Sequence, residues 1–321
     1  MCVSKGLEAC KVNSTQMAGV RTPHWKRQLR KSKYLYAMFA LPAIYFVLFH
    51  FIPIFGNVIA FQNYNVFSGF IKSPWVGWDH FKVFLYDPYF WKLVRNTLML
   101  NLYGLLFNFP APIVLALLLN ELRVKFFKRL VQSVAYLPHF LSTVVISGML
   151  VNFLALDGML NRLIEWFGAE QIQFLIEPSW FRTIYTASDI WQQVGWGTII
   201  YLAALTGIDP QLYEAARMDG ANRWKQALHV TLPSLVPVIT ILFLLAIGNS
   251  LSVGYEKILL LYNGATYETA DVIQTYVYRR GLLGSDLSFA SAVGLFQSVV
   301  AYILVVGANR LTRWLGGTSL W

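Results

Sequence analysis

Six long apolar segments, separated by polar intervals, constrain the fold of this 321-residue chain more than any other feature. The segments cover residues 34–60, 97–119, 131–156, 183–208, 234–253 and 289–311. A helix rises about 1.5 Å per residue, so each segment is long enough to cross the roughly 30 Å hydrocarbon core of a bilayer. With 56% hydrophobic and 13% charged residues, the chain is too apolar for an ordinary soluble domain. We therefore expect an all-α, polytopic membrane protein with six transmembrane helices.

The distribution of Lys and Arg predicts how these helices are oriented. The formal net charge is +10, and most of the 26 cations lie in residues 1–33, in the loop around residues 123–129, in the interval 210–237 and near the C-terminus. Cytoplasmic loops of membrane proteins carry an excess of Lys and Arg. We therefore expect both termini inside, and we attribute the positive charge to membrane topology and not to nucleic-acid binding. The predicted organisation is a basic tail (1–33), a six-helix membrane domain (34–312) and a short C-terminal tail (313–321).

Prolines and glycines inside the predicted helices mark bends and close contacts. Proline removes a backbone donor and bends a helix, whereas glycine allows two helices to approach closely. We expect bends at Pro110, Pro112 and Pro138 and close approaches at Gly148, Gly195 and Gly197.

The interval 210–237 is the only interior stretch that looks suited to a soluble partner. It begins with helix formers after Pro210, then has Asp219-Gly220, which breaks or turns a chain. A second helical run over residues 222–230 is expected to end at Leu232-Pro233. Because its charged side chains cannot lie in hydrocarbon, we expect this helix-turn-helix to lie at the membrane surface and to dock a partner.

The same interval carries a family resemblance. Glu214-Ala215-Ala216, Asp219-Gly220-Ala221, Leu232-Pro233 and Pro237 resemble the EAA loop of the permease subunits of bacterial ABC importers. Two positions depart from that pattern, because Ala227 and Val230 stand where the family often has Phe and Ile. The small Ala227 leaves open how the loop packs against its ATPase. Segments 73–81, 136–142, 190–196 and 262–282 further resemble the carbohydrate importers for oligo- and polysaccharides, including the lipo-oligosaccharide and alginate types.

This resemblance implies a type I ABC importer fold in the bacterial inner membrane. It implies a second permease subunit, which would make a heterodimer, a dimer of ATP-binding subunits, an external or periplasmic solute-binding protein and a carbohydrate substrate. ATP and Mg would bind the partner ATPase, and this chain would bind no cofactor. The ATPase-coupling residues implied are Glu214, Ala215, Ala216, Asp219, Gly220, Ala221, Leu232 and Pro233. Within that set we assign Glu214 to a charged contact, Gly220 to the sharp turn and the alanines to close packing in a cleft of the ATPase.

Motifs for chemistry on the chain itself are not found in the sequence. There is no GxxxxGK[ST] phosphate loop, no HExxH and no CxxC pair. The five histidines are scattered, and the two cysteines, Cys2 and Cys10, have no metal-ligand spacing. We expect neither a metal site nor an enzyme, so energy must come from another subunit.

Polar side chains inside the apolar segments are candidates for a substrate pathway, because they are costly in a membrane. Asp189, Gln192, Gln193 and Trp196 occupy helical offsets 0, 3, 4 and 7 and share one face. Further candidates are Asn152, Asn249, Ser250 and Tyr255. Amides and hydroxyls offer both donors and acceptors to a sugar. The alternative is that these groups only form hydrogen bonds between helices.

Two features on the predicted outer side also have two interpretations each. Lys257, next to Glu256, either extends its ammonium to the interface or joins Arg279 and Arg280 in attracting an anionic substrate. The aromatic-rich loop between the first two helices either forms an interfacial belt or meets a sugar or the binding protein.

Two other classes of function compete with an importer subunit. An ion-driven secondary transporter should show internal repeats and buried acidic relays, for which only Asp189 is a candidate. A membrane-embedded glycosyl- or acyltransferase needs a convergent acid, base or nucleophile, which the sequence does not assemble. The identity and length of the carbohydrate stay open.

Overall fold

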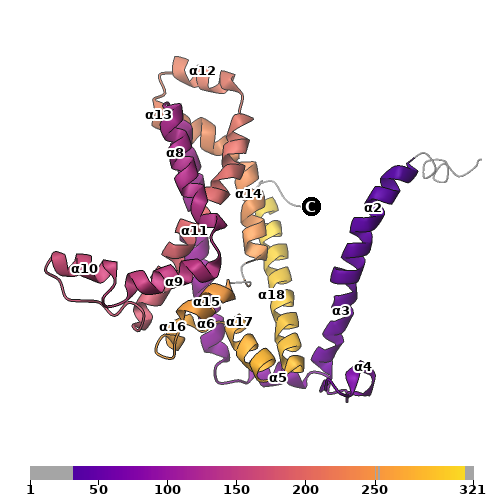
Figure 1. Ribbon diagram of the computed structural model, residues 1–321. Coiled ribbons are helices and arrows are strands. Elements are labelled where there is room, and N and C mark those ends of the chain that lie inside the picture. The colour runs from indigo at the N-terminus through magenta and orange to yellow at the C-terminus, as the bar shows by residue number, and fades with distance from the viewer. Residues whose placement is uncertain (1–31, 250, 252–253, 315–321) are drawn as a thin grey trace, which may run out of the picture. The chain divides into compact units, whose positions relative to one another are not determined.

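The computed structural model describes residues 32–249, 251 and 254–314, and these form helices joined by short loops, with no β-strand among them (Figure 1). The chain divides into two compact units, residues 1–57 and 58–321. The helices and the 3-10 or π-helical turns (η) are α2 Lys33–Phe46, η1 Val47–Phe51, α3 Ile52–Gly56, η2 Asn57–Phe61, α4 Gly69–Lys72, α5 Asp79–Leu85, α6 Phe90–Tyr103, η3 Gly104–Asn108, α7 Pro110–Glu121, α8 Lys125–Tyr136, η4 Leu137–Phe140, α9 Thr143–Leu154, α10 Met159–Trp166, α11 Pro178–Thr206, α12 Pro210–Met218, α13 Arg223–Gln226, η5 Ala227–Thr231, α14 Leu232–Gly248, α15 Tyr255–Leu261, α16 Tyr267–Ala270, α17 Ile273–Val277, η6 Tyr278–Leu283 and α18 Leu287–Trp314. The all-α prediction is confirmed.

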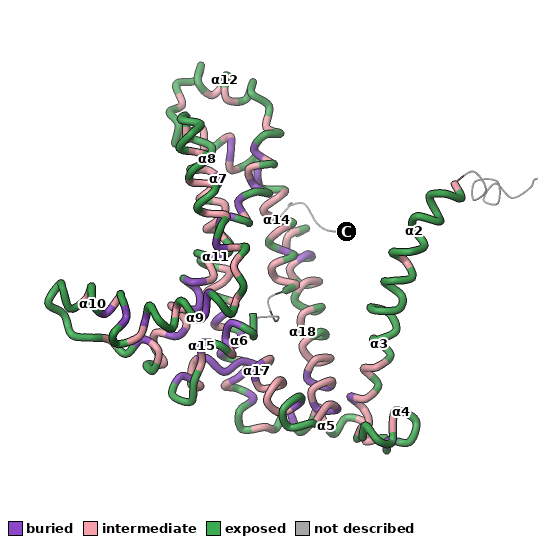
Figure 2. Tube along the Cα trace, in the orientation of Figure 1, coloured by how far each residue is buried: buried purple, intermediate pink, exposed green. Residues whose placement is uncertain are grey.

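The described part of the first unit is a helix, α2 to α3, with no buried side chain (Figure 2). Its sequence is strongly apolar and includes Pro42. An apolar helix exposed along its whole length is unfavourable in water, where large apolar patches are rare. It therefore requires lipid or a protein partner around it. The basic tail predicted for residues 1–33 lies outside the described residues except for its last two positions.

The second unit is organised around α11, the longest helix of the described chain. It packs against α7 and α8, and α14 packs against both α11 and α18. One apolar cluster joins α7, α11 and α14 through Ala116, Tyr201, Leu205 and Leu235. Figure 2 shows buried residues concentrated where these helices meet and where the short helices α15 and α17 cover their ends. The bundle thus has a packed interior that holds α11 on several sides.

Five helices in the described part of the chain are long and apolar enough to cross a membrane. They are Lys33–Phe61, Phe90–Glu121, Thr143–Trp166, Arg223–Gly248 and Leu287–Trp314. Helix α11, expected as the fourth of six spans, is 29 residues long but is not among the five. Polar residues such as Gln192 and Gln193 lower its hydropathy. Gln192 is buried and Gln193 hydrogen-bonds to His139, so both polar side chains have protein neighbours in place of lipid.

The third predicted span, residues 131–156, is wrong as one continuous helix. The structure divides it into α8 and α9, with η4 and two non-helical residues between them. Pro138 begins the interruption, and Ser142 caps α9 by accepting a hydrogen bond from Val145 N at 3.3 Å. A proline followed by an N-cap serine ends one helix and starts another.

The polar interval 210–237 forms a helix, a turn and a second helix, as expected, but the second helix does not end at Leu232-Pro233. Helix α12 ends at Met218, and Gly220 has φ +75°, a left-handed conformation that glycine adopts at little cost. The helix that starts at Arg223 continues through the π-helical turn η5 into α14. Leu232 N donates to Ala227 O, a bond over five residues. Pro233 follows directly on this π-helical turn, whose wider hydrogen-bonding pattern accommodates a residue without an N–H.

Two of the three predicted close approaches are found. A Cβ added to Gly195 would overlap the backbone of Ala135 in α8, and one on Gly197 would lie 2.9 Å from Pro112 Cγ. A Cβ added to Gly148 would meet nothing within 4 Å, so Gly148 makes no such approach within this chain. Gly195 therefore sets how closely α11 packs on α8.

We expect Gly195→Ala to destabilise the bundle, because the added methyl group meets main-chain atoms that cannot rotate away. Overpacking of this kind costs about 1–3 kcal/mol. The melting temperature of the detergent-solubilised protein should fall by several degrees. Gly148→Ala adds the same methyl group to an open site and is the matched control. Equal melting temperatures for the two variants would contradict the close packing of α11 on α8.

Candidate functional site

The first candidate region is the surface helix α12, which lies at the far end of α11 from α15 and α17 (Figure 1). Asp209 caps it by accepting a hydrogen bond from Gln211 N at 2.9 Å. Glu214 and Ala215 are exposed, and Glu214 makes no ion pair within the described part of the chain. A charged side chain on an exposed short helix is available to a partner.

Side-chain bonds tie this helix to the bundle. Tyr213 Oη of α12 lies 3.0 Å from Thr231 Oγ1 at the end of η5. Arg223 forms an ion pair with Glu121 at the end of α7, with a nitrogen-to-oxygen distance of 3.0 Å. Gln226 Nε2 donates to Ala221 O at 2.7 Å. These contacts link α12 to the helix that continues into α14, and they link the start of that helix to the end of α7.

The space beside Ala227 shows where its small side chain matters. Ala227 lines an apolar cavity of about 390 Å³ between α7 and the second helix of the loop. Trp224 and Leu228 line the same cavity. A bulky ring at position 227 would fill this space, so the alanine affects packing of the loop against α7 of the same chain.

The second candidate region is a polar cavity of about 390 Å³ beside the first half of α11, away from α12. It lies among α9, α11, α15 and α17. Four predicted pathway residues, Asp189, Gln192, Gln193 and Tyr255, line it together. The remaining lining residues are Thr143, Tyr185, Gly254, Glu256, Lys257 and Gln274. Three of the four residues predicted to share a face of α11 therefore line one cavity, and Trp196 does not.

A buried ion pair forms one wall of this cavity. Lys257 Nζ lies 3.3 Å from Asp189 Oδ1, and the Lys257 side chain is only 5% exposed. Asn108, from the π-helical turn η3, donates to the other carboxylate oxygen of Asp189. The prediction that Lys257 extends its ammonium to the membrane interface is therefore wrong, because that group is buried and paired with Asp189.

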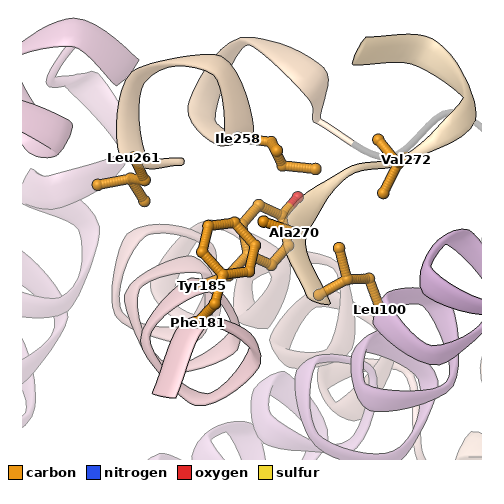
Figure 3. Close-up of a cluster of buried hydrophobic side chains, with 7 residues drawn as sticks. All are labelled: Leu100, Phe181, Tyr185, Ile258, Leu261, Ala270 and Val272. Carbon is orange, nitrogen blue, oxygen red and sulfur yellow. The ribbon is translucent and has the colours of Figure 1, made fainter. Parts of the chain in front are cut away.

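An apolar cluster positions this ion pair. Figure 3 shows Phe181 and Tyr185 of α11 beside Ile258 and Leu261 of α15. Ile258 is adjacent to Lys257, and Tyr185 lies one helical turn before Asp189. Packing of the two helices through these side chains therefore brings the charged residues together.

Three other predicted pathway residues, Trp196, Asn152 and Asn249, do not line the cavity. Trp196 stacks on His139 with ring centroids 4.4 Å apart, and His139 bonds to Gln193 at 3.0 Å. Asn152 donates to Gly148 O of its own helix at 2.9 Å, and Asn249 caps α14. Ser250 lies outside the described residues. A role of these four residues in the pathway therefore stays a prediction.

Two lining residues of the cavity, Tyr185 and Gln274, and the Asn108 side chain that bonds Asp189 were missed from the sequence. Tyr185 precedes Asp189 by four residues, so the helical period would have placed it on the same face. Asn108 is a polar residue inside a predicted span and carried the same signal as the others. Gln274 lies on α17, a short helix whose position depends on tertiary packing, and no local signal marks it.

The outer arginines are engaged by carboxylates. Arg279 makes two hydrogen bonds to Asp271, at 2.8 and 2.6 Å. These bonds raise the pKa of the Arg279 guanidinium above its ordinary value, so the pair stays charged. Arg280 lies 3.6 Å from Asp87 and 3.7 Å from Asp286. Neither arginine presents an uncompensated charge.

The aromatic loop folds on itself around Phe61. Trp75 stacks on that ring with centroids 5.8 Å apart, and Trp78 meets it edge-on at 5.3 Å. Both tryptophans nevertheless stay about two thirds exposed, at 64% and 63%. The cluster therefore offers fixed aromatic faces on the surface of the second unit.

This chain matches the model of a known protein family over most of its length. The model of the family described as "Binding-protein-dependent transport system inner membrane component" matches residues 108–316. These residues include both α12 and the polar cavity. The match covers well over half of the chain.

Curated relatives and solved structures match over nearly the whole length. The Polygalacturonan/rhamnogalacturonan transport system permease protein YteP of Bacillus subtilis (strain 168) is 46% identical over 92% of this chain and 92% of its own. Protein LplB of the same organism is 45% identical over 90% and 91%. In a crystal structure of a bacterial ABC transporter involved in the import of the acidic polysaccharide alginate, one chain is 42% identical with a TM-score of 0.84. That match covers 90% of this chain and 98% of that one.

Proposed function

The chain belongs to the family of binding-protein-dependent transport system inner membrane components and is a permease of an ABC sugar importer, and we propose that it carries galacturonate-containing oligosaccharides. The observation that carries this proposal is the 46% identity, over 92% of both chains, to a permease named for polygalacturonan and rhamnogalacturonan. The similarity to a transporter of alginate, another acidic polysaccharide, points to the same substrate class.

The chain works with partners in this proposal. A second, different permease subunit completes the pathway, an ATPase dimer holds ATP and Mg, and an external binding protein delivers the sugar. The exposed α12 supports the ATPase contact, and the exposed Trp75 and Trp78 offer a surface to the binding protein. A solved relative was crystallised with a periplasmic protein bound to an alginate pentasaccharide, and it is 41% identical to this chain.

The proposed topology places α12 in the cytoplasm with both chain termini, in the inner membrane of a bacterium. Positively charged residues flank the ends of α7, α8 and α12, as the positive-inside rule requires. The polar cavity then lies toward the outer side, where the binding protein releases its sugar. Helix α11, packed inside the bundle, makes the sixth span.

Coupling in this proposal is a rigid-body movement. Closure of the ATPase dimer on ATP displaces α12, with Glu214, Ala215, Ala216 and Ala221 in contact with it and Asp219-Gly220 forming the turn. The Tyr213–Thr231 contact and the continuous helix through Leu232-Pro233 then move α14, and α11 follows because α12 directly succeeds it. This chain performs no bond chemistry itself.

The substrate proposal is tested with the complete importer in proteoliposomes containing ATP. We expect galacturonate oligosaccharide, with its binding protein, to stimulate ATP hydrolysis at least about tenfold above the basal rate. Malto-oligosaccharide of equal length should not stimulate it. Stimulation by the neutral sugar alone would contradict the acidic-sugar proposal while leaving the family assignment intact.

A further inference from the structure

Among the described residues, three charged side chains line the polar cavity, and the one cation of the three is already paired. Asp189 and Glu256 are acidic and Lys257 is basic, so the formal charge of the lining is −1. The Lys257 ammonium is already neutralised by Asp189 at 3.3 Å. Glu256 is exposed and makes no ion pair within the described residues. An added carboxylate would therefore meet net negative charge here.

Hydrogen-bonding capacity in the cavity is mixed. An ammonium group has three N–H donors, and Asp189 is the one acceptor that Lys257 bonds among the described residues. Glu256 offers acceptor oxygens at the rim. Gln274 lines the cavity, and its amide oxygen is buried without a hydrogen-bond partner in the described chain. A buried acceptor without a partner is costly, so a small rotation toward a donor in the cavity is favourable.

A hydroxyl group matches this mixture, because it both donates and accepts. A carboxylate only accepts, so it would offer no donor to Glu256 or to the buried Gln274 oxygen, and it would add repulsion. From this charge and donor pattern we infer that the cavity binds the hydroxyl edge of a sugar, and that uronate carboxylates face away from this subunit. The inference rests on the proposed acidic substrate and assigns its carboxylates to the other half of the pathway.

The ion pair has a specific part in this arrangement. Asp189 holds the Lys257 ammonium in place and offsets its charge, so the remaining N–H groups bind a sugar oxygen without the strong attraction of a free cation. Transport requires binding that is weak enough for release. A polyanion passing an uncompensated lysine in a low-dielectric bundle would be retained.

Variants of Glu256 test the inference in the complete importer in proteoliposomes, with galacturonate oligosaccharide as the probe. If Glu256 accepts from sugar hydroxyls, Glu256→Gln should lower maximal uptake about threefold and Glu256→Lys about tenfold, since each weakens or removes one hydrogen bond. If the cavity instead holds carboxylates, both variants make it less negative and uptake should rise. Unchanged or increased uptake in either variant overturns the inference.

Matched variants show whether the effect belongs to the cavity. Glu170→Gln removes a similarly exposed carboxylate from the loop before α11 and should leave uptake unchanged. Gln274→Leu should lower uptake about threefold, whereas Gln297→Leu, at another buried amide without a partner in the described chain, should not. Equal losses in the paired variants would count against the inference. A wild-type importer that takes up only neutral sugar contradicts the proposed function instead, which keeps the two failures distinct.

Discussion

Gly220→Val should reduce sugar-stimulated ATP hydrolysis about tenfold or more while the protein still inserts into the membrane. Gly220 has φ +75°, and a residue with a Cβ pays about 1–2 kcal/mol there, with β-branched side chains paying most. Relief of this strain reorients α12 relative to α13. Because a tenfold change in rate corresponds to about 1.4 kcal/mol, a displaced contact with the ATPase is enough for this loss. The measurement is ATP hydrolysis by the purified complex with loaded binding protein.

Gly168→Val is the matched control for this effect. Gly168 has φ +81° and is exposed, and a Cβ added there, as at Gly220, would meet nothing within 4 Å. The backbone cost is therefore the same, but Gly168 follows α10, away from the coupling loop. We expect its stimulated hydrolysis to stay within about twofold of wild type, on the ordinary scale of surface substitutions. Normal stimulation in Gly220→Val would remove the coupling role from this turn.

Asp189→Asn should destabilise the protein strongly, because it leaves the Lys257 ammonium buried without a countercharge. Breaking a buried pair costs about 3–5 kcal/mol, and the 28% exposure of Asp189 favours the lower end of that range. At roughly 2–4 °C per kcal/mol for a chain of this size, the melting temperature should fall by roughly 5 °C or more. Thermal unfolding of the detergent-solubilised complex measures this change.

The double variant Asp189→Asn with Lys257→Met should recover most of the lost stability, because both charges are then absent. Asp79→Asn is the surface control, since Asp79 and Lys82 form a pair whose side chains are 65% and 67% exposed. Its effect should be below about 1 kcal/mol. A double variant no more stable than Asp189→Asn alone would contradict the pairing of Lys257 with Asp189.

The parts of the fold that depend on local pattern could be predicted from the sequence. Long apolar runs predicted the helices, and Asp219-Gly220 predicted the turn after α12. Pro138 and Ser142 signal the break within residues 131–156. The long apolar run led us to predict one continuous helix instead. The continuous helix through Pro233 could not be predicted from proline's usual effect, because the π-helical turn before it accommodates the missing N–H donor.

The part of the candidate site that lies on one helix could also be predicted, because it depends on local pattern. Asp189, Gln192 and Gln193 share a face of one helix, and a helical period of 3.6 residues brings them together. Lys257 reaches Asp189 only because α15 packs on α11, a tertiary contact between residues 68 positions apart. One sequence read by itself carries no signal for such a pair. The role of each of these residues in transport stays a prediction.

Cross-linking of α12 to the ATPase tests most directly the central claim, that energy enters this permease through the interval 210–237. Ala215→Cys places a thiol on the exposed surface of α12, in a background where Cys2 and Cys10 are replaced by serine. With a short bifunctional thiol reagent and single cysteines in the ATPase cleft, we predict an adduct between permease and ATPase whose yield changes when ATP is added. A cysteine at Gly168 should give none. An Ala215→Cys protein that forms no adduct with any position of a co-purified ATPase would contradict the account.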